Sequence, residues 1–162
     1  MAELTVLEEK LGEVIGLAQA AQDTASKVAG LPEATDGLKQ VLKEMSREAE
    51  AQQRGEEIAD QLDGKKTAVL DKARETKSEA VEMQKTYLGE DADALDGLEF
   101  LLMAEAGELG HAEIAGVLAE KAGQREIIDY IAWALPIQQK HVQQTRDSAL
   151  DLAHDKDPNE TE

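Results

Sequence analysis

Cysteine is absent from this chain of 162 residues, and aromatic residues make up only 2% of it. Without cysteine there is no disulfide, no thiolate nucleophile and no zinc site with thiolate ligands. With so few aromatic side chains, the core has to be built from leucine, isoleucine, valine and alanine. The sequence contains no apolar run long enough to cross a bilayer, and its acidic start does not resemble a secretory leader. We therefore expect a soluble cytoplasmic protein with an aliphatic core.

Basic residues are also scarce, because 17 lysines and arginines stand against 35 aspartates and glutamates, for a formal net charge of −18. A protein that coats nucleic acid needs a basic face, so this charge argues against nucleic-acid binding. The acidity suits a solvated surface that keeps the protein in solution. We expect no nucleic-acid partner and no membrane partner, and we expect the chain to form a homo-oligomer.

The abundant residues are alanine, glutamate, leucine, lysine and glutamine, which are good helix formers, and the apolar ones recur at helical spacing. The sequence predicts an all-α fold, an up-and-down bundle of four to five long helices. The segment 66–88 is either a full member of this bundle or an ordered crossover between two helical hairpins. We expect one domain over residues 1–154 and an acidic disordered tail over 155–162. The expected helices span residues 3–29, 34–62, 66–88, 92–122 and 124–154.

Glycines occur inside two of the expected helices. Gly12 and Gly16 share one side of the first helix, and Gly107 and Gly110 lie in the fourth. A glycine inside a helix costs about 1 kcal/mol relative to alanine. Either another helix approaches closely at these positions, or they are tolerated surface glycines.

Polar residues lie on two apolar helix stripes where a core is expected. In the last helix, Gln138 lies at the middle of the stripe and His141 lies within its width. In the preceding helix, Glu105 lies among leucines. Buried polar groups need partners, and buried charges need them more. Pro136, two residues before Gln138, predicts a kink or a break in the last helix.

Folding each expected hairpin about its loop places several polar residues at one level of the bundle. Glu105 lies as far before the turn near residue 123 as His141 lies after it. In the metal-free interpretation, Lys77 and Glu105 form a buried ion pair, and Gln138 and His141 complete a network that sets the helix register. The predicted polar layer consists of Gln52, Lys77, Glu105, Gln138 and His141.

Two short motifs add a resemblance. Glu108-Leu109-Gly110-His111 is a Glu-x-x-His motif, and Gln138-x-x-His141 looks like a degraded copy on the next helix. Paired motifs of this kind are similar to those of the ferritin-like carboxylate proteins. Residues 94–153 also resemble uncharacterised bacterial ferritin-like proteins that are distantly similar to the YciE/YciF-like stress proteins. This resemblance implies a ferritin-like bundle that binds iron or manganese and has a stress-related role.

The resemblance also implies a ligand set, although Gln138 replaces a glutamate of the family pattern and the first helix has no glutamate centred on its stripe. Two interpretations stay open. The chain is a stress-related protein with a transition metal in its core, or it is a non-catalytic interaction or structural bundle whose polar layer holds no metal. Whether it is an enzyme also stays open. The implied metal ligands are Glu48, Glu105, Glu108, His111 and His141.

Overall fold

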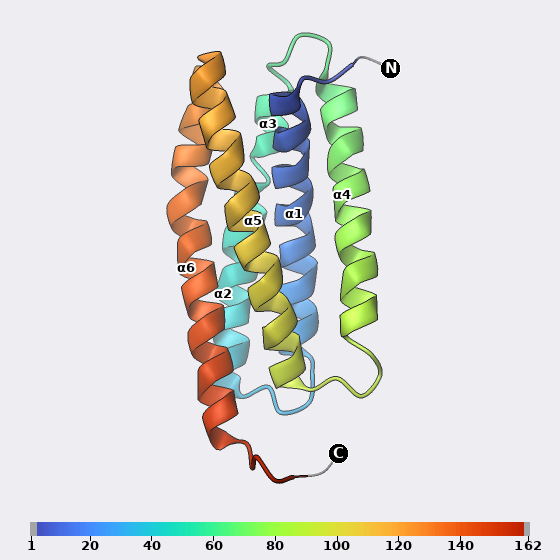
Figure 1. Cartoon of the computed structure of the whole chain (residues 1–162), viewed down its shortest axis with the longest axis vertical. Helices are drawn as coiled ribbons and strands as arrows, with labels where there is room; N and C mark the ends of the chain where they lie inside the picture. The colour runs from blue at the N-terminus through green and yellow to red at the C-terminus, as the bar shows by residue number, and fades with distance from the viewer. Residues whose placement is uncertain (1–2, 161–162) are drawn as a thin grey trace.

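The computed structural model of the chain describes residues 3–160, apart from the side chains of residues 51 and 52. These residues form six helices and no strand, which confirms the predicted all-α fold (Figure 1). None of the helices in this part of the chain is long and apolar enough to span a membrane. The helices are α1 (Val6–Ala29), α2 (Asp36–Gln52), α3 (Gly55–Ala59), α4 (Lys66–Tyr87), α5 (Ala94–Ala122) and α6 (Arg125–Asp155).

Two antiparallel hairpins form the central bundle, one made of α1 with α2 and α3, the other of α5 with α6 (Figure 1). Consecutive long helices run in opposite directions, so α2 and α5, which precede and follow α4, run parallel to each other (Figure 1). α1 packs against α2 and α5, and α2 also contacts α6, so these four helices surround the core. α4 packs on the outside of α1 and scarcely touches α5. The segment 66–88 is therefore a helical crossover between the two hairpins.

α1 and α4 approach each other closely along a row of small residues. An added Cβ on Gly12 would lie 2.8 Å from the backbone oxygen of Val69. One on Gly16 would overlap the backbone oxygen of Ala73. Any side chain at these two positions would push α4 away from α1, so of the two alternatives for Gly12 and Gly16 the structure has the close approach of another helix.

The expected helix 34–62 is divided in the structure. α2 ends at Gln52, and the chain turns before α3 begins at Gly55. A Cβ on Gly55 would lie 2.5 Å from Cγ1 of Ile15 and 3.1 Å from the hydroxyl oxygen of Tyr130. The break therefore lets the backbone itself pack against α1 and α6, and the prediction of one continuous helix was wrong here.

The beginning of the expected tail has defined contacts. The Nζ atom of Lys156 lies 2.7 Å from an oxygen of Glu33 and 2.6 Å from an oxygen of Asp93. These ion pairs attach the end of α6 to the loops that precede α2 and α5. The acidic disordered tail over 155–162 stays a prediction, and residues 161–162 lie outside the described part of the chain.

The aliphatic core is divided into two clusters along the bundle axis. One cluster, which includes Leu11, Ile15 and Ile131, lies toward α3 and the turn between α5 and α6. The other, which includes Leu42 and Leu98, lies toward the loops before α2 and α5. Polar side chains from α2, α5 and α6 occupy the level between the two clusters, and these side chains form the candidate site.

Candidate functional site

Helices α5 and α6 supply most of the buried polar side chains at this level. α6 continues through Pro136 without a break, so Gln138 and His141, three residues apart, share one face of a single helix. The same spacing places Glu105 and Glu108 on neighbouring positions of α5. All four residues are buried: Gln138, His141 and Glu105 are each 1% exposed, and Glu108 is 3% exposed. We define the polar layer as Glu48, Glu105, Glu108, Gln138 and His141.

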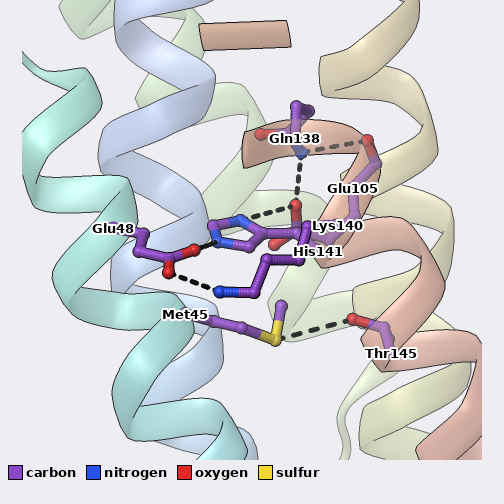
Figure 2. Close-up of polar contacts among 7 residues, drawn as sticks. All are labelled: Met45, Glu48, Glu105, Gln138, Lys140, His141 and Thr145. Atoms are coloured by element: carbon purple, nitrogen blue, oxygen red, sulfur yellow. Dashed lines mark hydrogen bonds and ion pairs between the residues drawn. The ribbon is translucent and has the colours of Figure 1, made fainter. Parts of the chain in front are cut away.

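His141 lies between two carboxylates (Figure 2). Its Nε2 atom is 2.8 Å from Oε2 of Glu48, and its Nδ1 atom is 3.5 Å from Oε2 of Glu105. Burial alone would lower the pKa of His141, but the hydrogen bonds and charges of Glu105 and Glu48 outweigh burial and raise this pKa. The arrangement favours an imidazolium that donates to a carboxylate from each ring nitrogen.

Glu48 connects the layer to the surface of the bundle. Its Oε1 atom accepts a hydrogen bond from Nζ of Lys140 at 2.6 Å, and its side chain is 32% exposed (Figure 2). Burial raises the pKa of Glu48, but the hydrogen bonds from Lys140 and His141 outweigh this effect, so the pKa is lowered. Two cationic groups, on Lys140 and His141, thus stand beside the carboxylates of Glu48 and Glu105.

Gln138 acts as a donor to Glu105. Its Nε2 atom donates to the carboxylate oxygen Oε2 of Glu105 and, at 3.2 Å, to the backbone oxygen of the same residue. An ionised glutamate at this position would only accept, and it would repel Glu105. The amide that breaks the second Glu-x-x-His motif is therefore the group that this network needs. The Oε1 atom of Gln138 is buried without a hydrogen-bond partner.

Glu108 is a second buried carboxyl group beside Glu105. Burial, and then the negative charge of Glu105, raise the pKa of Glu108 well above its usual range, while a hydrogen bond with Gln138 opposes them. Two carboxylates this close and this buried do not both ionise easily, so Glu108 tends to stay protonated. Glu108 also lines a cavity of about 210 Å³ between α1, α4 and α5.

Lys77 does not belong to the layer. Its Nζ atom pairs with Oδ2 of Asp23 at 3.0 Å, and its side chain is 37% exposed. The predicted buried ion pair between Lys77 and Glu105 was wrong, because α4 lies outside α1 instead of facing α5 and α6. Counting residues from the loops could not show that Lys77 would lie on the other side of α1 from Glu105.

His111, another predicted site residue, also lies apart from His141. His111 faces α1, where its Nδ1 atom is 2.9 Å from Oε2 of Glu13, and its side chain is 37% exposed. The Glu-x-x-His motif of α5 is thus split between the polar layer and the contact with α1. The side chain of Gln52 lies outside the described part of the chain.

The contacts of the layer do not form a metal centre as they stand. Both ring nitrogens of His141 face carboxylate oxygens, so neither is left for a metal. Across the described residues, no group of three or more histidine, aspartate and glutamate side chains is arranged to hold a metal ion. Iron or manganese would require His141 to give up one carboxylate, and the layer fits a hydrogen-bonded network better than a resident metal.

One buried polar contact was missed from the sequence. Gln84 of α4 donates to the hydroxyl of Thr24 at 2.8 Å, and this hydroxyl donates to the backbone oxygen of Ala20 at 2.9 Å. Gln84 and Thr24 are 7% and 4% exposed. The weak amphipathic pattern of α4 concealed which of its polar residues faces α1, so no clear signal for this contact was available.

Comparisons with known proteins give no relative for this chain. No protein-family model matches it, and neither a curated protein sequence nor a solved structure was found to match it. The resemblance to ferritin-like proteins thus depends only on residues 94–153 and the two motifs within them. Its function has to be argued from the polar layer and from the surface around it.

Proposed function

We propose that this chain is a non-catalytic helical-bundle protein that acts by binding another protein, and that its polar layer works without metal. The observation that carries the proposal is the position of His141, whose two ring nitrogens are both used by carboxylates, Glu48 at 2.8 Å and Glu105 at 3.5 Å. A network with this pattern holds helices together by charge and hydrogen bonds, and it needs no further ligand.

The layer supports this role because it specifies which helix positions meet. The aliphatic clusters on either side of it consist largely of alanine, leucine and isoleucine, which can pack in several registers. A shift of α6 by one turn, about 5.4 Å, would move His141 away from both of its carboxylates. It would leave Glu105 buried without a partner, which costs several kcal/mol.

A protein-binding role is favoured by the surface. Seven large apolar side chains are exposed in the described residues, and five of them lie on α4 and α5. Apolar side chains that gather on one side of a protein mark interaction sites more often than scattered ones do. We propose the cytoplasm as the location, and we keep a homo-oligomer as one arrangement that a binding surface of this kind permits.

A second candidate function is stress-related binding of iron or manganese, as in the ferritin-like proteins. The observation that favours it is the pair Glu105 and Glu108, two carboxyl groups buried side by side whose repulsion a cation would relieve. Two hairpins joined by one long crossover are also an arrangement that ferritin-like bundles use. This candidate needs His141 to turn away from a carboxylate before it can bind a metal.

One substitution separates the two candidates. Glu105→Gln removes the charge opposite His141, and we expect a loss on the order of 3 kcal/mol in the free energy of unfolding. If the layer is metal-free, this loss is the same with and without added Fe²⁺ or Mn²⁺, measured by urea denaturation. Glu113→Gln, at an exposed position of the same helix, is the matched control and should change stability little.

The metal-binding candidate predicts a different pattern. Wild-type protein would gain stability with increasing metal concentration, because a ligand that binds only the folded state stabilises it. The Glu105→Gln protein would lose this gain while its metal-free stability changed little. That result would overturn the metal-free interpretation of the layer.

A further inference from the structure

The outer face of α5 carries a row of apolar and small residues. Met103, Ile114 and Val117 are exposed by 42%, 51% and 59%. Together with two glycines they repeat at alternating spacings of four and three residues, which is typical of a helix face that packs against another helix. No helix covers this face within the described part of the chain. We define the outer stripe as Met103, Gly107, Gly110, Ile114 and Val117.

The two glycines of the outer stripe have no role in the packing of the chain itself. A Cβ added to Gly107 or Gly110 would meet nothing within 4 Å. At Gly12 and Gly16, by contrast, the cost of glycine is offset by the close approach of α4. The glycines of the outer stripe therefore leave room for a helix that comes from outside the chain.

A groove between α4 and α5 continues the outer stripe toward the start of α5. Two hollows of about 210 Å³ and about 300 Å³ share Phe100 and Met103. From α4, Met83 lines one hollow and Tyr87 the other, and these side chains are 51% and 58% exposed. Methionine side chains are flexible and adapt to the shape of an apolar partner. The groove is thus suited to large aliphatic side chains from a second helix.

Charge indicates which kind of helix fits. Asp96 and Glu99 line the hollow beside Tyr87, and Glu113 lines a third hollow of about 440 Å³ along the outer stripe. Among the residues that line these three hollows there is no lysine or arginine. A second copy of this chain, with its formal net charge of −18, would bring acidic groups against acidic groups. A helix with a basic face would be complementary.

We propose that the outer stripe and the groove beside it bind a basic amphipathic helix of another protein. This inference deepens the proposed function and rests on its protein-binding part. From Met103 to Val117 the stripe is about 21 Å long at about 1.5 Å per residue, which suits four turns of a partner helix. The partner's apolar side chains occupy the groove and the stripe, and its lysines and arginines face the acidic border.

The test uses a synthetic helical peptide of leucine and lysine with all leucines on one face, and its binding is measured by fluorescence anisotropy at physiological salt. The double substitution Met103→Gln and Ile114→Gln is expected to raise Kd about tenfold, because it removes apolar contacts and changes no charge. The matched control is Val6→Gln with Leu150→Gln, which removes two other apolar side chains, exposed by 61% and 51%. The control is expected to change Kd less than about twofold.

A second variant distinguishes a binding role of the glycines in the outer stripe from a purely structural role. Gly107→Gln with Gly110→Gln places side chains where the chain itself has open space. Replacing glycine in a helix raises the helix propensity, so the melting temperature is expected to rise. The same side chains block the approach of a partner helix, so Kd is expected to rise about tenfold. The variant is then expected to be more stable than the wild-type protein but to bind the peptide more weakly.

Three results would overturn the proposal. The first is equal peptide binding by the wild-type protein and the Met103 and Ile114 variant. The second is equally tight binding of a peptide that contains lysine without leucine, because charge alone would then explain it. The third is a dimer in sedimentation velocity that the same variant dissociates, since a second copy would then occupy the stripe. None of these results alters the outcome of the Glu105→Gln experiment, so the two proposals fail separately.

Discussion

The polar layer and the contact between α1 and α4 hold helices together in opposite ways. In the polar layer, His141 and Gln138 of α6 meet Glu105 of α5 through hydrogen bonds between buried charged and amide groups. Between α1 and α4, the absence of side chains at Gly12 and Gly16 lets the two backbones touch. The first contact depends on charge, and the second depends on the small volume of glycine.

The two regions should therefore tolerate different substitutions. A substitution in the layer has to retain the charge or the hydrogen bond of the side chain that it replaces, because each partner there is a specific buried group. A substitution at Gly12 or Gly16 has to keep the volume small, because any added side chain meets the backbone of α4.

Removal of the buried cation should have the largest effect. His141→Phe leaves Glu105 buried beside Glu108 without a cationic partner, and we expect a loss of about 3–5 kcal/mol in the free energy of unfolding. His111→Phe is the matched control, because the pair that His111 forms with Glu13 is partly exposed; it should cost less than about 1 kcal/mol. Urea denaturation measures both. Equal losses would show that the layer has no special role.

Substitution by alanine, which adds one methyl group, should change the stability of the protein in opposite directions at Gly16 and at Gly107. Gly16→Ala places a Cβ against the backbone of Ala73, and overpacking of this kind costs about 1–3 kcal/mol. Gly107→Ala meets open space and should stabilise the protein by about 1 kcal/mol through helix propensity. Thermal denaturation followed by circular dichroism compares the two proteins. If Gly16→Ala also stabilised the protein, α1 and α4 would not be in close contact.

The smallest expected change is a dependence on pH at Glu108. The pKa of this carboxyl group is raised in the folded protein, first by burial and then by Glu105. Its contribution to stability is therefore fully present below its unfolded pKa of about 4.3 and is lost as the pH rises through the folded pKa. Glu108→Gln keeps a neutral side chain at every pH, so its advantage over wild type should grow between pH 5 and pH 8.

Urea denaturation at the two pH values measures this difference. His141, whose pKa is also raised, loses its contribution with rising pH, whereas Glu48, whose pKa is lowered, loses its contribution with falling pH. Both groups are present in wild type and in the Glu108→Gln protein, so the difference between the two proteins isolates Glu108. A constant difference across this range would contradict a protonated Glu108 in the folded state.

Much of the helix pattern could be predicted because it is local. The spacing of apolar residues placed the long helices to within a few residues, and it located Glu105, Gln138 and His141 on core-facing stripes. The break before Gly55 could not be predicted in this way, because its cause is the packing of that backbone against Ile15 and Tyr130, which are remote in sequence.

The choice of partners for the buried charges also depended on long-range packing. Residue counting from the loops placed Lys77 near Glu105, but it contained no information about which side of α1 the crossover helix takes. Glu48 was predicted only as a metal ligand, but it is the residue of α2 that contacts His141. The amphipathic pattern of α4 would allow this helix to pack on more than one side of the bundle. Only its packing against the other helices selects among these positions.

The helices, the aliphatic core and the polar residues at specific core positions follow from local features of the sequence, because helix propensity and apolar periodicity act within a few residues. Long-range packing places His141 between Glu48 and Glu105 and pairs Lys77 with Asp23. It also leaves the outer face of α5 uncovered by the described residues. These outcomes depend on how helices that are far apart in the chain approach one another. That approach is set by close contacts such as those at Gly12 and Gly16, which no local pattern specifies.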